Sequence, residues 1–195
     1  MKWLTAALLV IALALAGLLA YSRFGGGPQH GSSVDSLPHI PDLRLTADSG
    51  RAAKPFGPSD QLRLVFFGFT RCPDVCPATL GVLARSYEAL TPAQRAQVRV
   101  DFVTVDPAFD TPGQIRAYLD HFNKDFAGYT GRPDDLAALR KAFFVYSDQV
   151  KPGQFQHGDT VAVLDGQGRF RRVYDGQAVA SGGLTADLPK LIRAF

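Results

Sequence analysis

The chain contains only two cysteines, Cys72 and Cys76, and they lie four residues apart. With no further cysteines to build a disulfide framework, such a close pair indicates a local redox site or a metal site. Pro73, Asp74 and Pro77 place the pair in a turn and not on a packed apolar face. At this spacing in a helical turn both thiols would face the same way, so they could bind one ion or form a disulfide.

The segments around the cysteines predict where the thiols lie. Leu62 to Phe69 is aromatic and almost entirely apolar, which predicts a buried strand. After the cysteines, Leu80, Leu83 and Tyr87 recur at helical spacing. Sheets flanked by helices bind ligands outside the carboxyl ends of their strands, and a helix N-terminus lowers the pKa of a nearby thiol. We therefore expect thiolates there, the form that attacks disulfides and binds soft metals.

His157 is the residue best suited to complete a metal site with the two thiols. It lies in the polar, glycine-containing segment 151–159, which we predict to be a loop before a strand at Thr160. Most loop histidines lie on the surface, but in a thioredoxin-like sheet this loop approaches the helix that carries the cysteines. Two thiolates and one imidazole suit copper; zinc is less suited, because a structural zinc site needs four ligands and no fourth is evident. The only methionine is Met1, so a methionine-rich copper site is excluded from the folded part.

Strand-like and helix-like segments alternate from Pro38 onward. This order predicts an α/β fold with a mixed, thioredoxin-like sheet flanked by helices. Thr91-Pro92 and Thr111-Pro112 each combine an N-cap residue with a proline at the first helical position. We expect strands at Leu43–Thr46, Leu62–Phe69, Val98–Val105, Phe126–Thr130, Thr160–Leu164 and Phe170–Tyr174, and further helices at 111–122, from Pro133 and after Thr185.

The first 23 residues predict a membrane anchor. An apolar run from Leu4 to Ala20 is just long enough to cross a bilayer as a helix, and Lys2 ahead of it predicts that the following chain is exported. A cleaved signal segment is the alternative, because 14–16 resembles a cleavage site. Residues 24–37 are rich in glycine, serine and proline and predict a flexible linker, which contains His30. The chain thus divides into an anchor at 1–23, a linker at 24–37 and a folded domain at 38–195.

Structural roles explain most of the other charged residues that stand out in the sequence. The net charge of +3 is small, and Arg169, Arg171 and Arg172 lie along a predicted strand, so we expect no nucleic-acid site. Asp110 is explained by the loop and cap before the next helix. Asp106 ends a predicted strand beside the cysteines, where it could equally tune the site or stabilise the loop.

The sequence around the cysteines and His157 resembles that of the Sco/SenC family. Its members are copper chaperones associated with building the copper centre of cytochrome c oxidase. The similarity covers about 38–195, and its motifs are Phe66–Pro77 around the cysteines, Val105–Pro107 followed by Asp110–Pro112, and His157. The resemblance implies that Cys72, Cys76 and His157 bind a copper ion and that the redox state of the thiols controls this binding.

The resemblance also implies partners and a location. The partners would be the copper-bearing subunit of cytochrome c oxidase and other copper or thiol carriers. The location would be the bacterial inner membrane, crossed once, with the soluble domain facing the periplasm.

Two enzyme functions stand as alternatives. A periplasmic thiol–disulfide oxidoreductase would use the same pair, although such enzymes usually carry the closer C-x-x-C spacing. A thiol peroxidase would need one activated cysteine and an arginine that polarises the peroxide, a role for which Arg71 is so far only a neighbour in sequence. Whether the chain is an enzyme therefore stays open.

Overall fold

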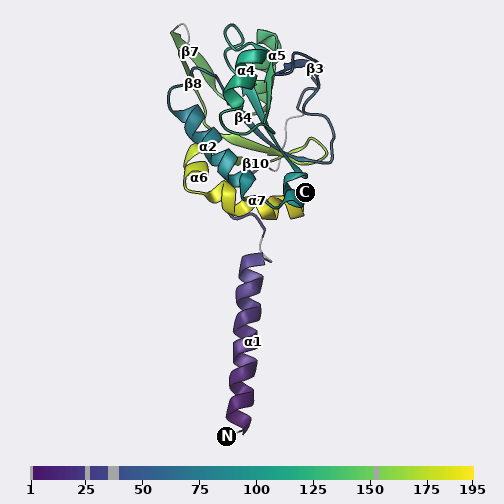
Figure 1. The fold of residues 1–195 in the computed structure, drawn as a ribbon, viewed down its shortest axis with the longest axis vertical. Coiled ribbons are helices and arrows are strands. Elements are labelled where there is room, and N and C mark those ends of the chain that lie inside the picture. The colour runs from purple at the N-terminus through teal and green to yellow at the C-terminus, as the bar shows by residue number, and fades with distance from the viewer. Residues whose placement is uncertain (1, 25–26, 35–39, 152–153) are drawn as a thin grey trace.

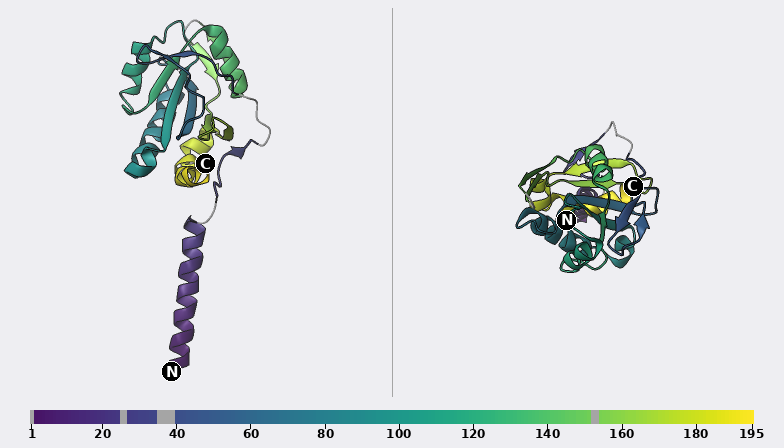
Figure 2. Two further views of the ribbon diagram at one scale, coloured as in Figure 1. Left: turned by 90° about the vertical axis from the view of Figure 1, so that its right-hand side faces the viewer. Right: turned by 90° about the horizontal axis from the view of Figure 1, so that it is seen from above.

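A computed structural model describes residues 2–24, 27–34, 40–151 and 154–195, and for residues 2, 4, 20, 22–24, 148–151, 154, 156 and 157 it describes the backbone alone. A 23-residue helix, α1 (Lys2–Phe24), projects from a rounded domain formed by the rest of the chain (Figures 1 and 2). The leucines described along α1 are exposed. Within the described residues, no helix is both long enough and apolar enough to cross a membrane.

The domain is built on one eight-stranded mixed sheet. In order across the sheet, its strands are β1 (Ser32–Ser33), β10 (Phe170–Tyr174), β9 (Val161–Leu164), β4 (Leu62–Gly68), β5 (Val98–Thr104), β6 (Ala127–Thr130), β2 (Leu45–Ala47) and β3 (Ala52–Ala53). The pairs β4–β5 and β5–β6 are parallel, and the other pairs are antiparallel. All of β4 is buried, as its continuous apolar sequence predicts. The predicted α/β class, with a mixed sheet, is confirmed.

Helices cover both faces of this sheet. They are α2 (Val75–Glu88), α3 (Pro92–Arg95), α4 (Pro112–Leu119), α5 (Pro133–Ala142), α6 (Gly176–Ala180) and α7 (Gly183–Ala194). Successive side chains of a strand point to opposite faces. Phe66 accordingly packs toward Phe102, with ring centroids 6.3 Å apart, on the face that carries α4. Phe67 packs on the other face against Phe143, which follows α5, with centroids 5.2 Å apart.

The two predicted helix caps are both present. The Thr91 side chain accepts a hydrogen bond from the backbone of Gln94 at the start of α3, and Thr111 accepts one from Gln114 at the start of α4. These capping boxes fix where α3 and α4 begin, and α4 begins directly after the loop that contains Asp110.

The segment that contains His157 is not the loop that the sequence predicted. β7 (Ser147–Lys151) and β8 (Gln154–His157) form a separate two-stranded antiparallel sheet, in which His157 is opposite Ser147. These strands are polar and lack an apolar alternation, so the usual signal of a strand is missing. The Phe155 ring, 5.3 Å from the Phe69 ring, brings β8 to the carboxyl end of β4.

The predicted linker is also more ordered than expected. Residues 32–33 form β1 and pair with β10. Just before them, the Gln29 and His30 backbone N–H groups donate to the Asp187 carboxylate at 2.9 and 2.6 Å. His30 itself is half-exposed, and its Nδ1 lies 3.5 Å from Asp187 Oδ2. A flexible linker over all of 24–37 is therefore wrong for 29–34, which lie against the domain.

Replacing Asp187 with alanine should release this segment. The side chain is fully buried and also accepts a hydrogen bond from the Tyr174 hydroxyl at 3.1 Å, so the change leaves three donors without their acceptor. We expect a loss of about 3 kcal/mol in the free energy of unfolding. Faster hydrogen exchange at Gln29 and His30 would report the release.

The matched control is Asp42→Ala, because Asp42 pairs with Lys54 in an exposed ion pair. This control should change stability by less than about 0.5 kcal/mol.

The stabilisation that Asp187 provides should also depend on pH. Burial raises the pKa of Asp187, but hydrogen bonds from Gln29, His30 and Tyr174 outweigh it and lower the pKa overall. The stabilisation is present above the unfolded pKa of about 3.9 and is lost as the pH falls through the folded pKa. Unchanged exchange at Gln29 in the Asp187 variant would contradict this account.

Candidate metal and redox site

The two cysteines meet at the carboxyl end of β4, as predicted. Cys72 lies in the turn before α2, where its N–H donates to the Phe69 carbonyl at 3.2 Å. Cys76 lies in the first turn of α2, and its N–H donates to Cys72 Sγ at 3.4 Å. The two cysteines form no disulfide in this structure; Cys76 is fully buried and Cys72 is half-buried. The pair thus has an outer thiol that a partner can reach and an inner thiol beneath it.

The inner thiol does not have the lowered pKa that the sequence predicted. Its hydrogen bond with the Cys72 side chain, followed by burial, raises the pKa of Cys76 far above the ordinary value, and the nearby Asp110 carboxylate adds to the shift. The helix N-terminus is present, but these effects outweigh it. Cys76 therefore holds its proton until a cation or an electrophilic sulfur takes the place of that proton.

Gly68, the last residue of β4, leaves the space that the inner thiol fills. A Cβ at this position would lie 2.9 Å from Cys76 Sγ and 2.9 Å from the Phe102 ring. Both neighbours are buried, so neither can move freely away. The glycine is thus required for the close approach of α2 to the end of β4.

Gly68→Ala should therefore displace Cys76. We expect a loss of about 1–3 kcal/mol in the free energy of unfolding, because extra volume in a packed core forces its neighbours to shift. Gly113→Ala is a suitable control, since no atom lies within 4 Å of a Cβ built there. The two variants can be compared by denaturant unfolding and by the rate at which Cys72 and Cys76 form a disulfide. Equal disulfide rates in Gly68→Ala and wild type would show that Gly68 does not position the inner thiol.

Asp110 joins the ends of two parallel strands next to the cysteines. Its fully buried carboxylate accepts hydrogen bonds from the Thr70 hydroxyl at 2.5 Å, the Thr70 N–H at 3.1 Å and the Thr104 hydroxyl at 2.5 Å. Thr111, and not Asp110, caps α4. Asp110 therefore does more than the predicted loop or cap role: it fixes the turn that leads from β4 to Cys72.

Asp106 contacts the same turn from the other side. Its buried carboxylate accepts a hydrogen bond from Arg71 Nη2 at 2.6 Å. The Arg71 guanidinium also stacks on Phe109, 3.8 Å from the ring centroid. Asp106 thus acts on the site through the residue before Cys72. Because Arg71 is held in this way, the structure does not support its use as the peroxide-polarising group of a thiol peroxidase.

Tyr118 is a site residue that sequence reasoning missed. Its ring packs on Phe102, with centroids 6.0 Å apart, and Phe102 in turn borders Gly68. Among the residues that the structure describes, the buried Tyr118 hydroxyl has no hydrogen-bond partner. Burial, together with the negative charge that Cys76 and Cys72 carry when ionised, raises the pKa of Tyr118. No local pattern marks this residue, because only the packing of α4 on β5 brings it to the thiols.

The third predicted ligand is placed only in part. The backbone of His157 ends β8, but its side chain lies outside the described residues. Among the side chains that are described, no three residues of the types His, Cys, Asp and Glu gather closely enough to hold a metal ion. The structure thus brings Cys72 and Cys76 together and leaves the position of the imidazole open.

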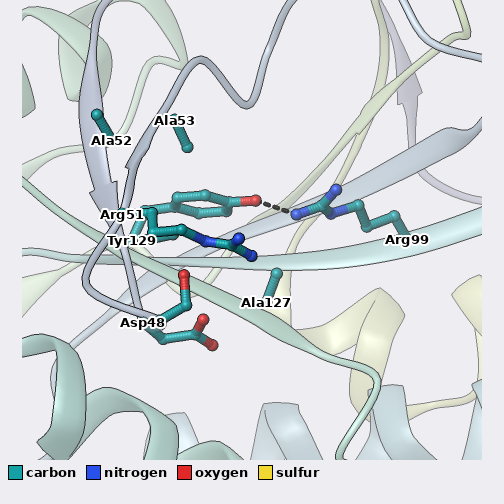
Figure 3. A pocket seen from close by; sticks show the side chains of 9 residues that line it. Asp48, Arg51, Ala52, Ala53, Arg99, Ala127 and Tyr129 are labelled. Atoms are coloured by element: carbon teal, nitrogen blue, oxygen red, sulfur yellow. Dashed lines mark hydrogen bonds between the residues drawn. The ribbon is translucent and has the colours of Figure 1, made fainter.

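A cavity of about 550 Å³ lies apart from the cysteines, beside β2, β3, β5 and β6. Figure 3 shows Arg99 reaching the Tyr129 hydroxyl, to which it donates a hydrogen bond, with Arg51 beside the same ring. Arg99 also donates to Asp101 Oδ1 at 2.8 Å, and the same carboxylate accepts from Arg63 at 3.1 Å. Neither a cysteine nor a histidine lines this cavity, which is therefore separate from the predicted site.

Comparison with known proteins identifies relatives of this chain in sequence and in structure. A protein of Stutzerimonas stutzeri whose name describes copper binding is 33% identical over 137 residues, which are 68% of this chain and 67% of that protein. The solution structure of apo Sco1 from Thermus thermophilus has a TM-score of 0.70 and 35% identity, covering 85% of this chain and 99% of that chain. The copper-bound structure of Bradyrhizobium japonicum ScoI has a TM-score of 0.63 and 26% identity, covering 80% of this chain and 98% of that chain. The family described as SCO1/SenC matches residues 35–193, and a match of this length shows that the chain belongs to the SCO1/SenC family.

Proposed function

We propose that this protein is a membrane-tethered copper metallochaperone that binds copper through Cys72, Cys76 and His157. It would deliver the ion to the copper centre of cytochrome c oxidase or reduce the cysteines of that centre. The observation that carries the proposal is the close cysteine pair at the end of β4, where the backbone nitrogen of Cys76 lies 3.4 Å from Cys72 Sγ.

The donor atoms of this pair fit copper as a cargo. Soft thiolate ligands select Cu(I), and a thiolate pair with an imidazole also supports Cu(II). A bound cation favours the thiolate form, which offsets the raised pKa of the buried Cys76. The copper-bound ScoI structure and the Stutzerimonas relative support copper over other soft metals.

His157 is proposed as the third ligand from the position of its strand. The contact between Phe155 and Phe69 holds β8 beside the end of β4, two residues before His157 in the chain. A short two-stranded sheet is a firmer support for a ligand than a polar loop. A third ligand at this position would matter for copper retention and much less for thiol–disulfide exchange, which uses the two cysteines.

A thiol–disulfide oxidoreductase is the second candidate, and the outer and inner positions of the thiols favour it. The Cys72 thiolate would attack one sulfur of a partner disulfide, and the partner's other sulfur would leave as a thiolate. Cys76 would then lose its proton to that thiolate and attack Cys72 Sγ, which releases the partner's remaining sulfur as a thiolate. This thiolate takes up from water the proton that Cys72 gave up when it ionised, so the partner ends as a dithiol. Two electrons pass to the partner, and the pair ends as a disulfide.

The delivery target and the location are proposed on the basis of family membership and of the sequence. The copper-bearing subunit of cytochrome c oxidase is proposed as the recipient, with other copper or thiol carriers as further partners. Tethering through α1 to the inner membrane, with the domain in the periplasm, is supported by the apolar run after Lys2.

The test is a copper titration of the full-length, reduced protein in detergent without oxygen. We expect one equivalent to bind, and His157→Ala to weaken the binding by about tenfold or more, since even residues that orient ligands contribute about 10–100-fold. His121→Ala, an exposed histidine after α4, is the matched control and should bind like the wild type. Failure to retain copper, with fast reduction of a test disulfide, would assign the protein to the oxidoreductases.

A further inference from the structure

An apolar groove lies between α2 and α6, next to the cysteine turn. It has a volume of about 210 Å³, and its apolar lining includes Val75, Ala78, Val82, Val179 and Ala180. Val75 is 40% exposed although it lies in the first turn of α2 between the two cysteines. The groove therefore leaves apolar surface uncovered at the edge of the proposed site.

Two carboxylates stand at this groove, Asp74 and Asp159. Asp74 precedes α2 but makes no capping hydrogen bond with its side chain. The Asp159 carboxylate lies against Gly176, where a Cβ would be 1.7 Å from Oδ2, so a side chain at 176 would require the carboxylate to move. The lining contains no lysine or arginine, in a chain with a net charge of +3. The groove is thus a locally acidic, apolar site on a basic protein.

The groove is continuous with both segments that supply the proposed ligands. Asp74 and Val75 lie between Cys72 and Cys76, and Asp159 lies two residues after His157. A protein that exchanges copper or electrons with Cys72 must bring its own sulfur within bonding distance of that thiol. The part of the partner next to its sulfur would then lie over the groove.

We propose that this groove docks a segment of the partner protein that carries an aliphatic side chain beside a lysine or arginine. The inference rests on the proposed function, because it names the partner surface that approaches the same cysteines. A volume of about 210 Å³ holds one or two side chains, so the groove acts as a selective contact within a larger interface. The paired carboxylates give orientation and charge selectivity, which electrostatic contacts provide more than bulk affinity.

The test measures peptide binding, which does not depend on redox or copper chemistry. Fluorescein-labelled peptides of the pattern Leu-Lys-Leu-Lys, Leu-Glu-Leu-Glu and Ser-Lys-Ser-Lys, without cysteine, are titrated with the full-length reduced protein in detergent. Fluorescence anisotropy reports binding. We expect the Leu-Lys peptide to bind about tenfold more tightly than either of the others, with the preference over the Leu-Glu peptide shrinking as salt is added.

The double variant Asp74→Asn, Asp159→Asn should abolish the preference for lysine over glutamate. The matched control is Asp134→Asn, Asp135→Asn, which changes the net charge equally on α5, outside the groove lining. The control should keep the preference. Equal peptide affinities in the wild type, or equal losses in both double variants, would overturn the docking proposal. Copper retention by the same proteins is measured separately. Failure of the docking proposal can therefore be distinguished from failure of the proposed function.

Discussion

Replacing Cys76 with serine should lower the affinity for Cu(I) by at least about a hundredfold, because it removes one of the two soft ligands. Cys76 is fully buried under the half-buried Cys72, so no solvent-exposed group can take its place in the site. A hydroxyl is a poor ligand for Cu(I), and its oxygen keeps its proton near neutral pH. Competition with a chromophoric Cu(I) chelator, under anaerobic conditions, measures the change.

Cys72→Ser serves as the comparison at the outer position. Both serine variants should lose copper, whereas their stabilities should differ, because only Cys76 is fully buried. Serine at 76 places a hydroxyl in the core and should cost about 1–3 kcal/mol of the free energy of unfolding. Copper loss in a Cys76 variant that is as stable as the wild type would still indicate lost ligation. Near wild-type affinity in either variant would exclude a two-thiolate site.

The sequence predicted the central elements of the fold well because their signals are local. A buried strand such as β4 is recognisable from its continuous apolar residues, and the caps of α3 and α4 from a threonine followed by proline. The cysteine turn then follows directly from the end of β4. These features needed no knowledge of what packs against them.

The features that the sequence did not reveal depend on contacts between distant segments. Thr70 and Asp110 are 40 residues apart, and Gln29 and Asp187 are 158 apart, so neither contact has a local pattern. The raised pKa of Cys76 likewise depends on its burial and its approach to Cys72, which the helix N-terminus alone does not predict. β8 was missed because its polar residues give no strand periodicity.

Contacts between distant segments therefore position the two cysteines more than the local cysteine motif does. Gly68 allows α2 to approach, Asp106 holds Arg71, and Asp110 holds Thr70, so three contacts converge on one turn. A motif of two cysteines supplies the chemistry, whereas these contacts position the turn and the helix that carry the two thiols. Changes at these positions should alter copper binding without touching a ligand.

Asp110→Ala should have the largest effect on stability, about 3 kcal/mol or more, because it leaves the Thr70 N–H, the Thr70 hydroxyl and the Thr104 hydroxyl without their acceptor. The turn to Cys72 would lose its main support, so Cu(I) affinity should also fall by about 10–100-fold. Asp120→Ala is the matched control, since Asp120 is half-exposed in an i,i+4 pair with Arg116. This control should change stability by less than about 0.5 kcal/mol. Denaturant unfolding and chelator competition measure both effects.

The pH dependence of this carboxylate provides a second, independent check. Burial raises the pKa of Asp110 despite the hydrogen bonds from Thr104 and Thr70 that favour its charged form. The folded protein therefore binds the proton more tightly than the unfolded chain does. This contribution to stability is fully present below the unfolded pKa of about 3.9 and is lost as the pH rises through the folded pKa. In Asp110→Asn, which resembles the protonated form, this loss should be absent as the pH rises above the unfolded pKa of about 3.9. The free energy of unfolding could instead change with pH in the same way in wild type and Asp110→Asn. That result would show that the carboxylate is charged at little cost, because its hydrogen bonds outweigh the effect of burial on its pKa.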